Sequence, residues 1–139
     1  MGVLNEAAKQ LLTSGRLAHL ATVNEDGSPQ LSVVWVGLED EKIVIGHLMG
    51  GRKIMNIGRR PQVTLSMEAE GANDIGMANY LIVRGRARLS EGGAPELLQR
   101  LAHVYLGPEV RFPPFDNPPG GHVIRITPEK VGGTGPWSG

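Results

Sequence analysis

Three apolar runs near the start of the chain are separated by polar turns that are too short to hold a helix. The runs span residues 16–23, 28–38 and 43–45, and the turns are 24–27 and 39–42. The first turn ends in a glycine, which can adopt a positive φ and suits a tight reversal. Strands joined this closely run antiparallel, so the pattern predicts an antiparallel meander. Apolar residues at both odd and even positions indicate strands covered on both faces, as in a barrel or at a subunit interface.

The apolar spacing elsewhere predicts three helices, over residues 4–13, 52–59 and 94–106. Met55 and Val104 are expected on the inner faces of the second and third helices.

Alternation of apolar and polar residues predicts further strands after Pro61 and over residues 80–89, and an apolar run predicts a last one over 123–126. The other segments are expected to be a polar loop over 70–76, an extended proline-rich loop over 107–121 and a glycine-rich tail over 132–139.

The length of 139 residues suits one domain spanning residues 1–139, with an N-terminal helical segment over 1–15. Because short turns join most strands, we expect a mainly β (α+β) fold with short flanking helices. A small antiparallel β-barrel of about six strands is favoured over a doubly wound sheet.

Composition excludes several classes of function. The chain has 14 basic and 14 acidic residues, and a net charge of zero argues against a nucleic-acid coat or a polybasic membrane binder. It has no cysteine, which excludes disulfides and thiolate chemistry and fits a reducing compartment. With no membrane-length apolar run and no signal-peptide pattern, a cytoplasmic protein without nucleic-acid or membrane partners is expected.

The segment HLMGGRKIMN, residues 47–56, is the most informative for function. It passes from a strand through two glycines into a helix whose first turn carries Arg52 and Lys53. Two cations at the positive end of a helix dipole are unfavourable unless an anion binds there. A phosphate held by backbone N–H groups and both cations would resolve the conflict, whereas the alternative is a solvated basic turn that binds nothing. The spacing is not that of a Walker loop or a Rossmann glycine motif.

Other polar residues give weaker signals. Arg84, Arg86 and Arg88 lie at a spacing of two on one predicted strand, where they would either meet an acidic ligand or simply protect an exposed strand face. The four histidines have no metal-ligand spacing, and no serine lies in a nucleophile elbow. We therefore predict no metal site and name no catalytic residue.

An ordered set of motifs resembles the pyridoxamine-phosphate-oxidase-like split β-barrels. It extends from about residue 12 to residue 131 and consists of LATV at 20–23, DGSPQ at 26–30, VVWV at 33–36, GRK at 51–53, RRPQV at 59–63, YLIVRG at 80–85 and ITPEKV at 126–131.

This resemblance implies a homodimer that binds a flavin-like cofactor in a groove between the subunits. Arg52 and Lys53 would hold the cofactor phosphate, and His47 stands where many relatives carry a small hydroxyl residue. The strand over residues 30–35 would run along the ring system, with Asn79 and Tyr80 approaching from a neighbouring strand. The implied cofactor-binding residues are Gln30, Ser32, Val34, Trp35, His47, Gly51, Arg52, Lys53, Asn56, Asn79 and Tyr80.

The chain length, the DGSPQ and VVWV motifs and the proline-rich segment look most like the branch that uses the deazaflavin coenzyme F420; related branches use FMN. The resemblance then implies an oxidoreductase that transfers hydride between F420 and a small unsaturated organic substrate. The oligoglutamate tail of F420 would give Arg84 or Arg86 a partner. An FMN-dependent oxidoreductase and a protein that binds F420 or flavin without turnover are the alternatives.

Overall fold

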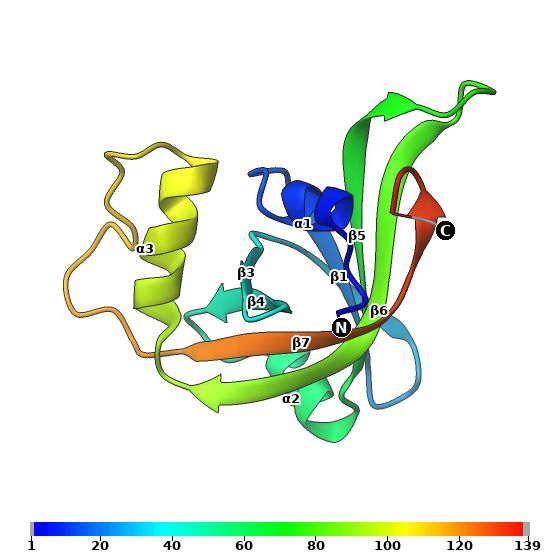
Figure 1. Cartoon of the computed structure of the whole chain (residues 1–139). Helices are drawn as coiled ribbons and strands as arrows, with labels where there is room; N and C mark the ends of the chain where they lie inside the picture. Colours follow the sequence, from blue (N-terminus) through cyan, green and yellow to red (C-terminus); the bar gives the residue numbers. More distant parts are fainter. Residues whose placement is uncertain (1, 138–139) are drawn as a thin grey trace.

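Seven antiparallel strands form one curled sheet in the computed structural model, which describes residues 2–137 (Figure 1). Their order across the sheet is β2-β1-β5-β6-β7-β4-β3. The fold is therefore a mainly β split barrel as predicted, with seven strands where about six were expected. The strands are β1 (Ala18–Val23), β2 (Pro29–Val34), β3 (Gly37–Glu39), β4 (Lys42–His47), β5 (Gln62–Ala72), β6 (Ala78–Glu91) and β7 (His122–Thr134).

The additional strand comes from residues 28–38, which the apolar pattern predicted as one strand. The run divides at Trp35 and Val36 into β2 and β3, which lie at opposite ends of the sheet order. Both predicted antiparallel turns are confirmed, since β1 pairs with β2 and β3 pairs with β4, but the continuous meander is wrong because the middle run is divided between the two pairs. At the division the Val36 N–H donates to the Tyr105 hydroxyl at 3.0 Å, so a side chain replaces a neighbouring strand. The apolar pattern of residues 28–38 could not predict this break, because the partner, Tyr105, is distant in the sequence.

Three short helices pack around the sheet: α1 (Glu6–Leu12), α2 (Arg52–Arg59) and α3 (Ala94–Tyr105). The Asn5 side chain caps α1 by accepting the Ala8 N–H at 2.9 Å. Helix α2 has the predicted bounds, but Met55 and Val104 are exposed, so the prediction that they face inward is wrong. The buried face of α2 includes the polar residues Lys53 and Asn56, which an apolar pattern does not count.

The main core fills the inside of the curled sheet and includes residues from Leu4 to Trp137. A smaller cluster of Val44, Leu97, Leu101 and Val123 packs α3 against β4 and β7. Gly37 allows this close approach, since a Cβ there would lie 2.8 Å from a methyl carbon of Leu101.

The last strand is longer than predicted. Strand β7 extends to Thr134, so the first residues of the expected tail belong to the sheet, paired with β6. Beyond it Trp137 is buried in the main core, and its indole N–H donates to the Tyr80 carbonyl at 2.9 Å. Residues 138–139 of the expected tail lie outside the described residues.

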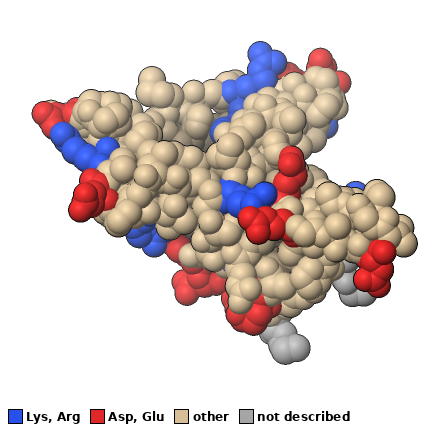
Figure 2. Space-filling model, turned by 90° about the horizontal axis from the view of Figure 1, so that it is seen from above, with Lys and Arg blue, Asp and Glu red and all other residues tan. Residues whose placement is uncertain are grey.

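The surface carries acidic and basic side chains interspersed, without a field of one sign over the face seen in Figure 2. Across residues 2–137, no helix has the length and apolar character needed to cross a membrane.

Candidate functional site

The predicted phosphate site lies where β4 ends and α2 begins, at the lower side of the molecule in Figure 1. The first turn of α2 contains no acidic residue, and no side chain caps its N-terminus. The first backbone N–H groups of any helix lack intrahelical acceptors, and in α2 no side chain takes their place. The helix dipole also favours a negative charge at this end. A Cβ built on Gly50 would meet nothing within 4 Å, and one on Gly51 would lie 3.9 Å from His47 Nε2. The two glycines thus leave open space beside the helix N-terminus.

Lys53 is the most unusual residue of this corner. It is only 8% exposed, yet its ammonium makes no hydrogen bond or ion pair with any residue from 2 to 137. Burial lowers the pKa of Lys53 because the charged form loses its hydration. The ammonium nitrogen itself keeps some contact with solvent, but its charge is poorly hydrated, and an anionic ligand would compensate it.

His47 lies beside Lys53 and is half-buried. Burial is the largest cause that lowers the pKa of His47, followed by the positive charge of Lys53 and then by His122. The imidazole is therefore neutral at pH 7 and can donate one hydrogen bond and accept another.

The lowered pKa of His47 makes the stability of the protein depend on pH. Below pH 6.5 the unfolded chain takes up a proton that the folded chain still rejects, so the free energy of unfolding falls as the pH drops through this window. We expect His47→Gln to flatten the slope between pH 7.5 and pH 5.5, as measured by urea unfolding at several pH values. His103→Gln, at an exposed histidine, serves as control, and an unchanged slope in His47→Gln would contradict the assignment.

A cavity of about 400 Å³ opens next to Lys53 and His47. No aspartate or glutamate lines it, so its polar character is cationic or neutral, while its remaining wall is apolar and aromatic. The other lining residues are Val33, Val34, Trp35, Gly46, Leu48, Met49, Leu98 and Phe112.

Aromatic rings build one wall of this cavity. Trp35 stacks on Tyr105 with ring centroids 5.3 Å apart, and it meets Phe112 in a tilted arrangement at 5.1 Å. Tyr105 is itself held, since its hydroxyl donates to the Arg16 carbonyl at 2.7 Å. A wall of this kind suits a flat ligand.

A polar network holds α2 against the hairpin of β1 and β2. Asn56, 1% exposed, donates from Nδ2 to Thr22 Oγ1 at 3.0 Å and to Asn24 Oδ1 at 2.9 Å. Its Oδ1 accepts from Arg59 at 2.6 Å, and the Thr22 hydroxyl donates to Gln30 Oε1 at 2.8 Å. Asn56 and Gln30 are thus engaged inside the chain and position the start of α2; direct contact with a cofactor stays a prediction for both.

Most of the predicted site residues are close in space. Val34, Trp35, His47 and Lys53 line the cavity, while Gly51 and Arg52 adjoin it in the chain. Ser32 lies on the same strand as Val34, and its Oγ is shielded from solvent without a hydrogen-bond partner in the described structure. Ser32 does not line the cavity, so its contact with a cofactor stays a prediction.

Asn79 and Tyr80 are not part of this cavity. They lie at the start of β6, on the hairpin that projects at the upper right of Figure 1, whereas α2 lies below. The Asn79 side chain donates to the Glu70 carbonyl at 3.3 Å. Within one protomer these two residues are separate from the other predicted contacts, so the predicted role would need a second subunit.

Arg84, Arg86 and Arg88 are exposed on one face of β6, as the alternation predicted. None of the three forms an ion pair within the described chain. Arg84 and Lys130, paired across β6 and β7, both line a groove of about 660 Å³ that is distinct from the Lys53 cavity. An acidic ligand for this stripe stays a prediction.

Sequence reasoning missed Leu98, Met49 and Phe112 as lining residues. Leu98 has the spacing of an ordinary helix core residue, and Phe112 lies in a loop where no periodicity signals its contacts.

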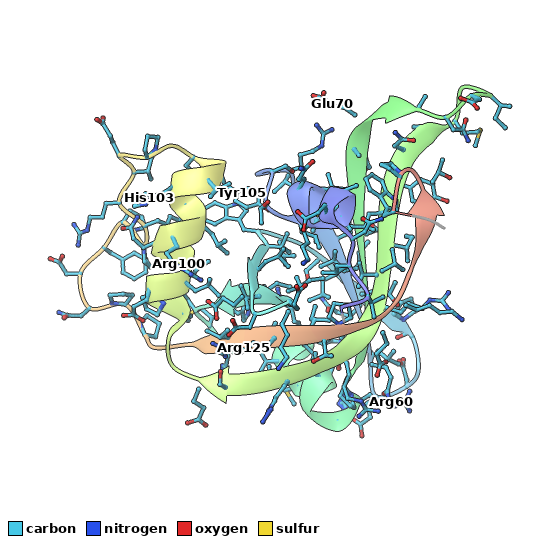
Figure 3. All side chains as sticks on the ribbon, viewed as in Figure 1. Arg60, Glu70, Arg100, His103, Tyr105 and Arg125 are labelled. Atoms are coloured by element: carbon cyan, nitrogen blue, oxygen red, sulfur yellow. The ribbon has the colours of Figure 1, made fainter. Side chains whose placement is uncertain are left out.

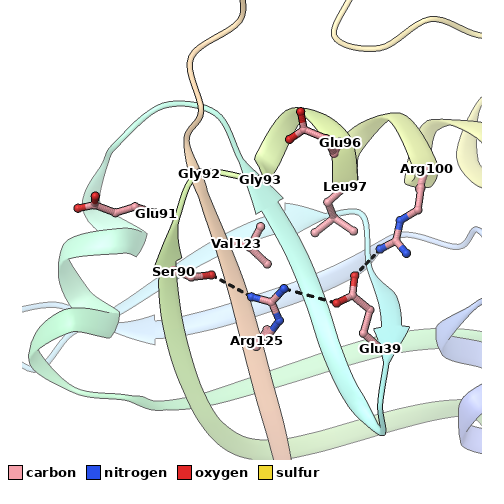
Figure 4. A pocket seen from close by; sticks show the side chains of 10 residues that line it. All are labelled: Glu39, Ser90, Glu91, Gly92, Gly93, Glu96, Leu97, Arg100, Val123 and Arg125. Carbon is pink, nitrogen blue, oxygen red and sulfur yellow. Dashed lines mark hydrogen bonds and ion pairs between the residues drawn. The ribbon is translucent and has the colours of Figure 1, made fainter.

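A further cavity of about 480 Å³ lies at the N-terminal end of α3 (Figure 4). Glu91 and Glu96 line it without an ion pair among residues 2–137, whereas both of its arginines are paired: Glu39 accepts from Arg100 at 2.5 Å and from Arg125 at 3.4 Å. Arg125 also donates to the Ser90 hydroxyl at 2.8 Å. Because its arginines are already paired, this cavity is a weaker candidate than the one beside Lys53. Across residues 2–137, no three histidine, aspartate or glutamate side chains gather in a metal-binding arrangement.

Comparisons with known proteins agree with the fold and with the motifs. Residues 4–135 match the family model described as pyridoxamine 5'-phosphate oxidase. A solved structure described as an F420 reductase is 25% identical with a TM-score of 0.75, covering 93% of this chain and 98% of that one. No curated protein matches the chain.

Two further solved structures share the fold. A conserved hypothetical protein from Mycobacterium tuberculosis is 23% identical with a TM-score of 0.69, covering 92% of this chain and 82% of that one. General Stress Protein 26 from Bacillus anthracis is 21% identical with a TM-score of 0.60, covering 89% of this chain and 88% of that one.

Proposed function

The chain belongs to the pyridoxamine 5'-phosphate oxidase family, a family of flavin-binding oxidoreductases, and on this basis we propose that it is an oxidoreductase that uses the deazaflavin coenzyme F420. The observation that carries the proposal is Lys53, a largely buried lysine whose ammonium has no partner within residues 2–137, at the edge of a cavity with an aromatic wall. Such a cavity can accept a ligand that has a phosphate group at one end and a flat ring system at the other.

The residues present fit such a coenzyme. Lys53 and Arg52, together with the free N–H groups at the start of α2, supply positive charge for a phosphate, and the glycines before them leave room for it. The apolar and aromatic side chains around Trp35 give a surface on which a flat ring system can pack.

The coenzyme, when bound, supplies hydride transfer to or from an electron-poor double bond in a small organic substrate. This chain contributes binding and orientation, and the cavity lining contains no carboxylate that could act as a general acid. Solvent would then provide the proton that accompanies the hydride.

F420 is preferred over FMN because the F420 reductase resembles this chain over nearly its full length, at 25% identity. The family match itself is compatible with either coenzyme, so FMN is the second candidate.

We expect the purified protein to bind F420 at least about tenfold more tightly than FMN, a difference of roughly 1.4 kcal/mol. Equilibrium titration followed by absorbance and fluorescence measures both affinities, and mixing with reduced F420 and an activated alkene tests for hydride transfer. Tight binding of FMN alone would overturn the F420 assignment, and F420 binding without transfer to any unsaturated acceptor would support a carrier. If neither coenzyme binds, the phosphate site itself is wrong.

A homodimer that completes the cavity is part of this proposal. Strand β2 is an edge of the sheet, yet its Leu31 and Val33 are 64% and 56% exposed, and Val33 also lines the cavity. Exposed apolar side chains on an edge strand are a hazard unless another surface covers them. A second copy would cover them and could bring its own Asn79 and Tyr80 to the site. A mass close to the 14.9 kDa monomer in light scattering, with or without coenzyme, would contradict this part of the proposal.

A further inference from the structure

The proline-rich loop over residues 107–121 is bonded to α3 at both ends through the backbone, by Gly107 N–H to the Ala102 carbonyl and by Ala94 N–H to the Gly120 carbonyl. Between these ends the side chain of Gln99 holds it. Gln99 donates from Nε2 to the Val110 carbonyl at 2.8 Å, and its Oε1 accepts the Phe112 N–H at 3.0 Å. Its Nε2 also lies 3.0 Å from Nε2 of the exposed His103. Figure 3 shows the loop running along the side of α3 that carries the labelled His103.

Phe112 is the point at which this loop reaches the cavity. Its ring lies 5.1 Å from the ring of Trp35, and both line the cavity beside Lys53. Pro113, next in the chain, is buried. The position of the Phe112 ring therefore depends on where the backbone of residues 110–112 is held, and Gln99 holds it on both sides.

We propose that Gln99 is a positioning residue that fixes Phe112 against Trp35 and so sets the shape of the ligand cavity for flat, apolar substrates. The identity of the ligand rests on the proposed function, whereas the link from Gln99 to Phe112 does not. Gln99 acts through Phe112 and does not line the cavity itself.

The chemistry of the glutamine amide explains the choice of residue. One side chain must donate to a carbonyl and accept from an N–H two residues further on, and an amide does both. A glutamate at position 99 would accept the Phe112 N–H but could not donate to Val110, and an alanine would do neither. These differences separate the two hydrogen bonds experimentally.

The first experiment uses the protein without ligand. In Gln99→Ala, we expect hydrogen exchange at the Phe112 amide to be about tenfold faster. Acrylamide should also quench tryptophan fluorescence more strongly, because a displaced Phe112 ring would leave Trp35 more accessible. The change can be assigned to Trp35, which is partly exposed, since Trp137 is buried. Gln99→Glu should keep slow exchange at Phe112. Arg100→Ala, at the next residue of α3, where the side chain pairs with Glu39, serves as the matched control and should change neither.

The second experiment is a double-mutant cycle on binding of F420, or of FMN if that is what the native protein binds. We expect Gln99→Ala and Phe112→Ala each to raise the dissociation constant about fivefold, and the double variant to be no weaker than Phe112→Ala alone. That non-additivity is what distinguishes positioning through Phe112 from a general loss of loop stability.

Unchanged exchange at Phe112 in Gln99→Ala would overturn the proposal, and so would a full additional loss of affinity in the Phe112→Ala background. Failure of the proposed function has a different signature. In that case neither coenzyme binds the native protein, while exchange and quenching still report on Gln99. If Gln99→Ala does not fold, the Gln99→Glu variant still tests the separate bonds to Val110 and Phe112.

Discussion

Lys53→Met should weaken coenzyme binding by about 10-fold to 150-fold while making the protein without ligand slightly more stable. A hydrogen bond to a charged group contributes roughly 1.5–3 kcal/mol, which gives that range of affinity. In the absence of ligand, the Lys53 side chain is largely buried and its ammonium has no partner in the described structure, so a methionine of similar length removes a poorly hydrated charge. We expect a gain of about 1 kcal/mol in the free energy of unfolding, or roughly 3 °C in Tm for a chain of this size.

Isothermal titration and thermal unfolding measure the two effects. Lys42→Met, at a partly exposed lysine of β4 that lines neither the Lys53 cavity nor the Arg84 groove, is the matched control and should leave both quantities nearly unchanged. A large loss of stability with unaltered affinity would mean that Lys53 is structural, and the phosphate site would have to lie elsewhere. A loss of coenzyme affinity together with a gain in the free energy of unfolding would identify Lys53 as a cation that serves ligand binding and not folding.

Asn56→Ala should have the largest effect on stability of the substitutions considered. The change removes two donated bonds and one accepted bond at a side chain that is 1% exposed, and it leaves Asn24 Oδ1 without its partner. Burying polar groups without hydrogen bonds and opening a cavity together cost about 2–4 kcal/mol. Urea unfolding measures this loss. Because Asn56 positions α2, coenzyme affinity should also fall, in contrast to the selective effect at Lys53.

Two variants check that the network is responsible. Asn56→Asp retains an acceptor for Arg59 but loses both donors, so it should be destabilised through the contacts with Thr22 and Asn24. Met55→Ala, at the exposed neighbour, should change stability by less than about 0.5 kcal/mol. If Asn56→Ala remains within that same range, the network does not hold α2 in place.

Local patterns predicted the elements whose determinants are local. Helix α2 has the predicted bounds, and the alternation of arginines on β6 appears as an exposed face. The hypothesis that Arg52 and Lys53 bind an anion could be formed from electrostatics alone, because their conflict with the helix dipole is a property of neighbouring residues, and it stays a prediction.

Features that depend on distant contacts were beyond this reasoning. The break between β2 and β3 is accompanied by a bond from Val36 to Tyr105 on α3, 69 residues away. Phe112 reaches the cavity because Gln99 holds its loop, 13 residues from the glutamine. The prediction that Met55 faces inward was wrong because the buried face of α2 also includes the polar residues Lys53 and Asn56, which turns Met55 toward solvent. In each case the residue that determines the structure does not belong to the apolar periodicity from which the elements were predicted.

The attachment of loop 107–121 at Gln99 has a consequence for how this protein can diversify. Residues 114–120 lie beyond the attachment and before β7, and no strand pairing passes through them. Doubling the length of such a segment costs only about 0.6 kcal/mol in loop-closure entropy. Insertions before Gly120, whose carbonyl accepts from the Ala94 N–H, can therefore add surface to the loop that carries Phe112 without disturbing the sheet.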